Sequence, residues 1–262
     1  MCMNDSFVKY FDDLATNIEA KSKGKSIFLK CNFGNWGDAL IREGTLHFLV
    51  DYGFKFREIL PGKSYYFRPM IYGGLLLFGG GGGWCRGYAH PERFCRRARR
   101  RLDVMVLPST FENRVDIPGV EFWRRDDFLT KKFMPQSLFC HDMAFYLATK
   151  RFPQVEGSGV GSFFRTDREA AAHSLPRFNR DISKEGNDLT PTRGFFSIVN
   201  KFELIQTDRL HVAIAGALLG KKVKFYAGVF PKNEAIYQAS LRDYFPSVEW
   251  CGSDFESILQ ED

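Results

Sequence analysis

Short apolar runs alternate with helical patterns along most of this 262-residue chain. Residues 26–31 form a predicted buried strand, and residues 39–52 repeat apolar side chains at helical spacing until Gly53 ends the helix. Further strand patterns follow at residues 54–59, 75–78, 103–107, 119–123 and 139–143. Strands that alternate with helices indicate a parallel sheet with helices on both faces, and such sheets bind ligands at the carboxyl ends of their strands.

A break near residues 151–161, which contain one proline and three glycines, divides the chain. Beyond it we predict strands at residues 162–165, 203–206, 222–226 and 248–251, and helices at residues 167–172, 195–202, 209–219 and 234–241. The expected fold is α/β, with two Rossmann-like halves that face a cleft and a small second half. The expected domains are residues 1–152 and 153–262, and a terminal helix is expected to pack back on the first domain.

The composition excludes several classes of protein. Hydrophobic residues make up 44% of the chain and charged residues 26%, which is typical of a globular protein and not of a disordered chain or coiled coil. The longest nearly apolar run, residues 70–84, is too short and too rich in glycine to cross a bilayer as a helix. Because the N-terminus lacks the pattern of a secretory signal, we expect a cytoplasmic protein.

The six cysteines are scattered, without the CxxC or CxH spacing of a metal site. In a cytoplasmic protein they are expected to be reduced and mostly buried, so no zinc site is expected. They are Cys2, Cys31, Cys85, Cys95, Cys140 and Cys251.

A formal net charge of +6 favours anionic partners, such as phosphorylated metabolites, an acidic membrane surface or nucleic acid. Much of this charge is local, in the arginines Arg93, Arg96, Arg97, Arg99, Arg100 and Arg101. Apolar side chains at helical spacing lie among them, which predicts a helix that packs on the sheet and has a basic outer face. The same face is also suited to rest on anionic lipid or to guide an anionic substrate, and the two interpretations are compatible.

The segment Asn32-Phe-Gly-Asn-Trp-Gly-Asp38 lies where the first strand ends and the next helix begins. Glycines allow a tight turn there, and the free amides of a helix N-terminus attract anions. Two interpretations of Asp38 remain open. It either caps the helix, or it lies at the carboxyl end of the strand and accepts a proton from a sugar hydroxyl.

Five consecutive glycines, at residues 79–83, follow the apolar strand at residues 75–78. Ordering such a run costs chain entropy, so it indicates either a tight structural turn or a close approach of the backbone to a ligand. The run matches neither the GxGxxG dinucleotide fingerprint nor a P-loop.

Residues 205–211, with the sequence IQTDRLH, are the most specific pattern, and an apolar helix follows them. Thr207 or Asp208 is predicted to cap this helix, which places Arg209 and His211 in its first turn. A cation is unfavourable at the positive end of a helix dipole unless an anion binds there. Arginine suits phosphate or carboxylate, and histidine exchanges a proton near neutral pH. The alternative is a core histidine beside a surface arginine.

Five segments occur in an order that one protein family shares. Residues 35–38 match an early NxGD element, residues 78–83 a strand followed by glycines, and residues 207–215 a late RLH helix. Residues 124–126 and 141–147 look like the intervening RD and D-x-A-F segments. Together these segments resemble the polysaccharide pyruvyl transferase family, over most of the chain from about residue 26 to residue 240.

The resemblance implies a fold like that of two-domain GT-B glycosyltransferases, and transfer of a pyruvyl group from phosphoenolpyruvate to two sugar hydroxyls, which forms a ketal. Arg209 and His211 would contact phosphoenolpyruvate, and Asp38 would lie on the acceptor side. Further substrate-binding residues are expected at Arg165, Lys232, Asn35, Gly80, Gly81 and Gly82. No metal or cofactor is expected besides the donor substrate. The chain departs from the family pattern in its compact second half and in Asp208 before Arg209.

In the expected reaction, His211 protonates the methylene of phosphoenolpyruvate, Asp38 assists the attacking hydroxyl, and Arg209 stabilises the leaving phosphate. The expected partners are a hexose-containing glycan or lipid-linked oligosaccharide and the anionic inner face of the membrane, with no nucleic acid. Two alternatives remain: a GT-B-like glycosyltransferase that uses a nucleotide sugar, and a non-catalytic protein that binds anionic lipid or RNA through the arginine helix.

Overall fold

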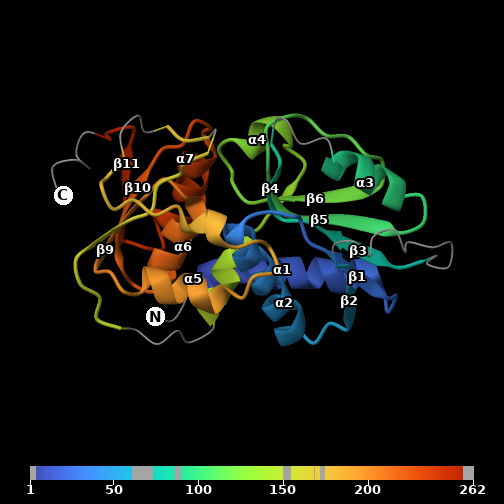
Figure 1. Ribbon diagram of the computed structural model, residues 1–262. Coiled ribbons are helices and arrows are strands. Elements are labelled where there is room, and N and C mark those ends of the chain that lie inside the picture. The colour runs from blue at the N-terminus through green and yellow to red at the C-terminus, as the bar shows by residue number, and fades with distance from the viewer. Residues whose placement is uncertain are drawn as a thin grey trace. The chain divides into compact units, whose positions relative to one another are not determined.

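The computed structural model describes residues 4–60, 73–85, 90–149, 155–167, 169–171 and 175–255. The chain forms two compact units (Figure 1). The N-terminal unit comprises Met3–Phe33 and Gly44–Tyr146, and the C-terminal unit comprises Gly34–Glu43 and Leu147–Asp262. The main division therefore falls near the expected boundary at residue 152, and one short segment from early in the chain belongs with the later residues.

The N-terminal unit is built on a parallel sheet of seven strands. These are β1 (Ile27–Lys30), β2 (Phe56–Glu58), β3 (Leu75–Phe78), β4 (Gly81–Trp84), β5 (Asp103–Phe111), β6 (Val120–Arg124) and β7 (Leu138–Phe139). Their order is β2-β1-β3-β5-β6-β7, with β4 paired to β5. Because the order reverses between β1 and β3, the segments after these two strands lie at the switch point where such sheets bind ligands.

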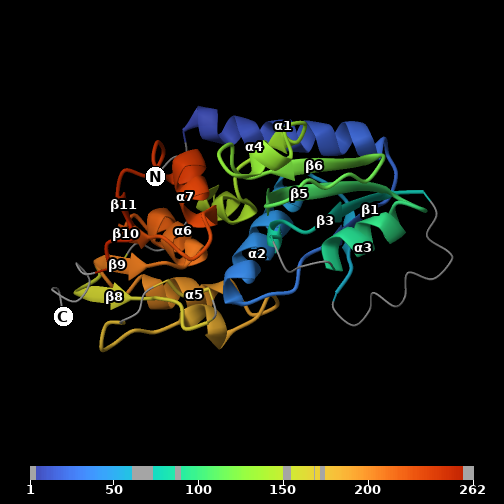
Figure 2. The same ribbon diagram turned by 90° about the horizontal axis from the view of Figure 1, so that it is seen from above.

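Helices cover both faces of this sheet (Figure 2). Helix α3 (His90–Ala98) buries Cys95 in the core beside Phe28, Leu76 and Val104, whose side chains share one face. Figure 2 shows α1 (Asp5–Ser22) along the opposite face. The short helix α4 is Thr130–Phe133, while α2 (Trp36–Asp51) and the 3-10 helix Met143–Thr149 each continue from one unit into the other.

The C-terminal unit contains a second parallel sheet, with strand order β11-β10-β9-β8. Its strands are β8 (Val160–Ser162), β9 (Leu204–Thr207), β10 (Lys222–Tyr226) and β11 (Val248–Gly252). Its helices are α5 (Thr192–Val199), α6 (Leu210–Leu218) and α7 (Lys232–Ile236), with a 3-10 helix at Ile182–Glu185 and a π-helix at Tyr237–Leu241. Helix α6 is buried along nearly its whole length, because its sequence is apolar on every side.

The predicted α/β class with parallel sheets is confirmed. Some local predictions are wrong. The strand expected at residues 162–165 is β8, which ends at Ser162, so Arg165 follows the strand. The described residues between 167 and 171 are not helical, and the strand expected at residues 139–143 stops at Phe139. Helix α1 was not predicted, and the expected terminal helix lies outside the described residues.

The thiols agree with the sequence. Four described cysteines are buried and one, Cys251, is partly exposed, and all five are free. Cys2 lies outside the described residues. Among the helices that the structure describes, none has the length and apolar character needed to cross a membrane.

Candidate functional site

Helix α2 begins with a reciprocal pair of capping hydrogen bonds. Asn35 Oδ1 accepts a hydrogen bond from the amide of Gly37 at 2.8 Å, and Asp38 Oδ2 accepts one from the amide of Asn35 at 2.9 Å. A Cβ at Gly34 would collide with the carboxylate of Asp38, so this turn requires glycine. The arrangement is a capping box. Asp38 therefore caps the helix, from its third position, and its role as a base stays a prediction.

His211 packs directly on the start of α2. It is the second residue of α6, and its Nδ1 lies 2.6 Å from the point where a Cβ would stand at Gly37. Asn35 Oδ1 lies 3.0 Å from the same point. Only glycine at position 37 leaves room for the imidazole ring. Two predicted motifs that are far apart in the sequence therefore meet within the C-terminal unit.

Two helix N-termini, those of α2 and α6, come together at His211. The cap predicted at Thr207 or Asp208 is wrong, because the N-cap of α6 is Arg209 and no side chain caps this helix. Thr207 Oγ1 instead accepts a hydrogen bond from the amide of Arg209 at 2.9 Å, in the turn before the helix. The first-turn amides of a helix carry partial positive charge and favour an anionic group beside them. His211 is partly buried and its Nε2 atom is shielded from solvent, so proton transfer from this ring to a bound group stays a prediction.

Arg209 is buried, and two carboxylates hold its guanidinium. Its Nε donates to Asp181 Oδ1 at 2.9 Å, and its Nη2 lies 2.6 Å from Asp181 Oδ2 and 2.9 Å from Asp167 Oδ2. The sequence predicted that this guanidinium binds a substrate anion. In the structure, protein carboxylates already bind its Nε and Nη2 atoms, so a substrate anion would have to compete with them there.

Arg165 and Lys232 belong to the same network. Arg165 Nε lies 3.0 Å from Asp167 Oδ1, and its Nη2 lies 2.7 Å from Glu169 Oε2. Lys232 Nζ lies 2.7 Å from the same oxygen of Glu169. Partial burial opposes ionisation of Asp167, but the hydrogen bond and charge of Arg165 outweigh it and lower its pKa. The three predicted anion-binding cations are thus brought together, with acidic partners between them.

Asp208 and Asn233 are buried beside this network, and the sequence did not single out Asn233. Asp208 Oδ1 accepts from the amide of Arg165 at 2.8 Å, while Asn233 Nδ2 donates to the carbonyl of Asp208 at 2.7 Å. Asp208 Oδ2 and Asn233 Oδ1 have no hydrogen-bond partner among the described groups. Burial raises the pKa of Asp208 to about 6, although Arg165 and Arg209 act in the opposite direction.

Arg209 and His211 lie two positions apart but contact different groups. Arg209 contacts the carboxylates of Asp167 and Asp181, whereas His211 packs against Gly37 and Asn35. The sequence predicted that both side chains contact one donor molecule. In this structure each has its own set of protein partners. Among the described residues, no three or more His, Cys, Asp and Glu side chains are grouped so that they could hold a metal ion.

The glycine run lies at the switch point of the N-terminal unit. Gly79, Gly80 and Gly81 have φ angles of 76°, 110° and 82°, which side-chain-bearing residues rarely adopt. Asn32, which follows β1, donates through Nδ2 to the carbonyl of Gly80 at 2.6 Å. The expected turn is therefore real but shorter than predicted, because β4 begins at Gly81.

A buried ion pair lies beside this run, between two segments that matched the family pattern but for which the sequence predicted no role. Arg125 is 2% exposed, pairs with the carboxylate of Asp142, and donates through Nε to Thr110 Oγ1 at 2.8 Å. A Cβ at Gly82 would meet only the Nη2 of Arg125, at 3.7 Å. Because Gly82 has no side chain, there is space beside the guanidinium of Arg125.

An exposed aromatic ring stands at the end of β1. Phe33 is 51% exposed, and the Nζ of the buried Lys30 lies 4.0 Å from its ring centre. Large aromatic side chains are usually covered, so this ring at a switch point is a candidate contact for a ligand. The only sequence signal for it was its place within the Asn32–Asp38 motif.

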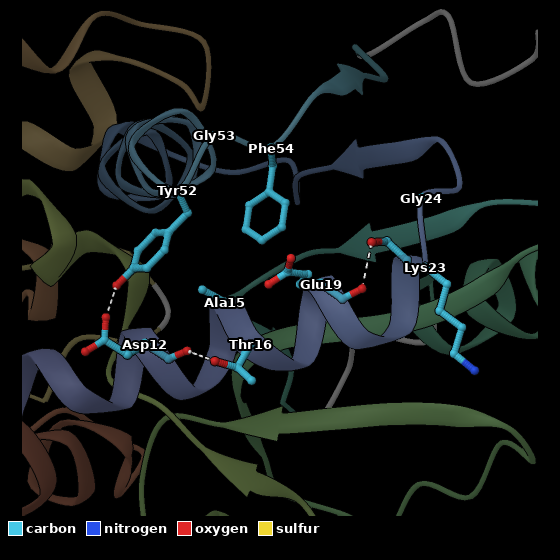
Figure 3. Close-up of a pocket in the computed structure, with 10 residues that line it drawn as sticks. Asp12, Ala15, Thr16, Glu19, Lys23, Gly24, Tyr52, Gly53 and Phe54 are labelled. Carbon is cyan, nitrogen blue, oxygen red and sulfur yellow. Dashed lines mark hydrogen bonds between the residues drawn. The ribbon is translucent and has the colours of Figure 1, made fainter.

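A pocket of about 560 Å³ lies elsewhere in the N-terminal unit, between α1 and the end of α2 (Figure 3). Asp12, Glu19, Tyr52 and Phe54 line it, and the hydroxyl of Tyr52 donates to Asp12 Oδ1 at 2.5 Å. The chain enters β1 and β2 beside this pocket, so it lies at the amino-terminal edge of the sheet. Parallel sheets bind ligands at the other edge, and none of the predicted site residues lines this pocket.

Comparisons with known proteins show the fold and give no activity. No protein-family model matches the chain, and no curated protein does. Among solved structures, the chain is similar to the crystal structure of an uncharacterized protein from Klebsiella pneumoniae subsp. pneumoniae. The two chains are 26% identical, with a TM-score of 0.77, and the match covers 95% of this chain and 99% of that chain.

Proposed function

We propose that this protein transfers a pyruvyl group from phosphoenolpyruvate to two hydroxyls of a hexose, in a polysaccharide or its lipid-linked precursor, and so forms a pyruvate ketal. One observation carries the proposal: the imidazole of His211 packs on Gly37 and beside Asn35. The two most specific segments of the resemblance are thereby adjacent. The imidazole and two helix N-termini then lie together, and this supports binding of an anionic donor substrate beside a group that can carry a proton.

The GT-B-like arrangement of the two halves is part of the same proposal. Each unit has its own parallel sheet with helices, which is the construction that the resemblance implies. In such sheets the carboxyl ends of the strands carry the ligands. The residues assigned to the donor follow β8 and β9 or begin α6 and α7, and the glycines expected to bind substrate follow β3.

In the proposed reaction, His211 gives a proton to the methylene carbon of phosphoenolpyruvate, and positive charge develops at C2. A hexose hydroxyl forms a bond to C2 and passes its proton to Asp38. The bond between C2 and the phosphate oxygen then breaks and phosphate leaves. The neighbouring hydroxyl forms a bond to C2, which closes the ketal, and passes its proton to His211. Arg209 and the N-terminus of α6 stabilise the leaving phosphate.

Two carboxylates bridge the three cations in the structure, and the proposed donor also carries two anionic groups. Phosphoenolpyruvate carries a phosphate and a carboxylate, and we propose that these replace Asp167 and Glu169 on Arg165, Arg209 and Lys232. Each of these two acids bridges two of the cations.

The test is release of inorganic phosphate from phosphoenolpyruvate across a panel of lipid-linked and nucleotide-linked hexoses, with the ketal detected by mass spectrometry. We expect release with at least one acceptor and none without an acceptor. Thermal protection by a nucleoside diphosphate, with no effect of phosphoenolpyruvate, would instead support a glycosyltransferase that uses a nucleotide sugar.

The proposed location follows from the proposed acceptor. A lipid-linked oligosaccharide presents its sugar at a membrane surface, so we propose a cytoplasmic protein that associates with the inner face of the membrane. Fractionation of cells that express the protein tests this part, and a release from membranes by salt is the expected result.

A further inference from the structure

Five of the six arginines in and just after α3 fall into two groups that the sequence could not distinguish. Residues 90–103 contain six arginines and only two acidic residues, Glu92 and Asp103. In the structure, two guanidiniums contact these acids or nearby backbone, and three others form no ion pair or hydrogen bond with the residues that the structure describes. Only the guanidiniums without a protein partner are available to bind an anionic partner.

Arg96 and Arg99 are engaged within the protein. Arg96 lies 2.7 Å from a carboxylate oxygen of Glu92 and also donates to the carbonyl of Asp116 at 2.8 Å. Arg99 lies 4.0 Å from Asp103, and its guanidinium packs on Gly119, where a Cβ would stand only 2.6 Å away. These two side chains hold the helix on the unit.

Arg93, Arg97 and Arg100 are exposed, and no described group forms an ion pair or hydrogen bond with their guanidiniums. Their spacing is i, i+4 and i+7, and the backbone hydrogen bond from Leu102 to Ala98 continues the helical turn past the end of α3. Residues at this spacing share one helix face. The three free charges therefore form a single stripe, which we call the arginine stripe.

The arginine stripe lies on a helix whose opposite side packs in the core, and an exposed aromatic ring lies near one end of it. The opposite side of α3 packs in the core, where Phe94 stacks on Phe78 with ring centres 5.0 Å apart. At the start of the helix, the ring of His90 lies 6.4 Å from the half-exposed ring of Phe33. A row of arginines next to an exposed aromatic ring is typical of protein surfaces that bind the interface of an anionic bilayer.

We propose that the arginine stripe, with Phe33 beside it, docks this protein on an anionic phospholipid surface. The guanidiniums bind lipid phosphates, and the ring enters the headgroup layer. This surface would serve the proposed transfer to a lipid-linked acceptor. Vesicle binding needs neither donor nor acceptor, however, so failure of the docking and failure of the reaction are measured separately.

The test is co-sedimentation with vesicles that contain phosphatidylglycerol and phosphatidylcholine, compared with vesicles of phosphatidylcholine alone. We expect binding to the anionic vesicles only, and loss of that binding in high salt. The variant R93Q/R97Q/R100Q should bind about 100-fold more weakly. Phe33→Ala should weaken binding several-fold and leave its salt dependence unchanged.

The matched control is R180Q/K222Q/R242Q, which removes the same charge from exposed side chains that are paired with acids. It should bind within about twofold of the wild type. Thermal unfolding of both variants shows that they are folded. Equal loss of binding in the two variants would assign the effect to net charge and overturn the proposal. Wild-type binding to single-stranded RNA, with none to anionic vesicles, would also overturn it.

Discussion

The Nδ1 atom of His211 occupies the space that any side chain at Gly37 would need, because it lies 2.6 Å from the Cβ position of that glycine. The contact joins the first turn of α2 to the first turn of α6 inside one compact unit. It places an imidazole beside the positive ends of two helices. On this basis we expect residue 37 to control both the stability of the protein and the position of the His211 ring.

Gly37→Ala should destabilise the protein by about 1–3 kcal/mol, because the added methyl group collides with the imidazole. In the His211→Ala background the same substitution should cost at least about 0.5 kcal/mol less, since the ring is gone. Urea unfolding of the four proteins measures this coupling. Additive effects would mean that the two residues do not contact each other in solution.

Asp208→Asn should stabilise the protein above neutral pH. Because burial raises the pKa of Asp208 to about 6, the folded protein keeps its proton between about pH 4 and pH 6 while the unfolded chain releases it. This carboxyl therefore lowers stability as pH rises through that range, by at most roughly 3 kcal/mol at pH 8. The variant should gain much of this amount at pH 8 and little at pH 4, measured by thermal unfolding. A loss of stability at pH 8 would show that the network needs the charged form.

Asp167→Asn should increase affinity for phosphoenolpyruvate, because it removes a carboxylate that competes for Arg165 and Arg209. We expect a gain of about tenfold in titration calorimetry, in line with one charge-assisted hydrogen bond. Asp243→Asn is the control, since it removes the same charge from an exposed pair with Arg242. Weaker binding in Asp167→Asn, with an unchanged control, would mean that Asp167 supports the site and does not compete for it.

His141→Phe should reduce sensitivity to acid. The ring of His141 stacks on Phe7 with centres 3.7 Å apart, and burial lowers its pKa to about 3. The unfolded chain takes up a proton below about pH 6.5 and the folded chain does not, so stability falls as pH drops from 6.5 towards 3. At pH 5 this histidine costs about 2 kcal/mol relative to pH 7.5. The midpoints of urea unfolding at pH 5 and pH 7.5 should differ less in the variant than in the wild type. An unchanged difference would show that His141 does not cause the sensitivity to acid.

The elements around β9 and β10 were predictable because local sequence determines them. Residues 222–226 form β10 as expected, and α6 ends before Gly220. Helix α1 carries equally clear local signals, with Asn4 as its cap and Phe7, Phe11, Leu14 and Ile18 on its buried face. This helix is therefore also encoded in its local sequence, although it was not predicted.

The strand expected at residues 162–165 shows where an apolar pattern misleads. Phe163 and Phe164 are buried as a strand pattern requires. The amide of Phe164, however, donates to the side chain of Asn179 at 2.7 Å and not to a neighbouring strand. A distant side chain thus satisfies the backbone, and no local pattern reveals this.

The candidate site was predictable in its residue types but not in its partners. The RLH pattern indicated a cation and a proton donor at a helix start, and the structure has both there. That Asp167 and Asp181 would hold Arg209 depends on how distant segments fold together, so the sequence had no signal for it. The pairing of Arg209 with these two carboxylates is the main difference between the expected site and the structure.

The most direct measurement is the rate of phosphate release from phosphoenolpyruvate in the presence of a hexose acceptor, for the wild type and for His211→Gln. The variant keeps a polar side chain of similar size but cannot act as a general acid near neutral pH. We expect a fall of about 100-fold or more in kcat, with binding of phosphoenolpyruvate changed little. Full phosphate release by the variant would contradict the assignment of His211, and no release by the wild type with any acceptor would contradict the proposed reaction.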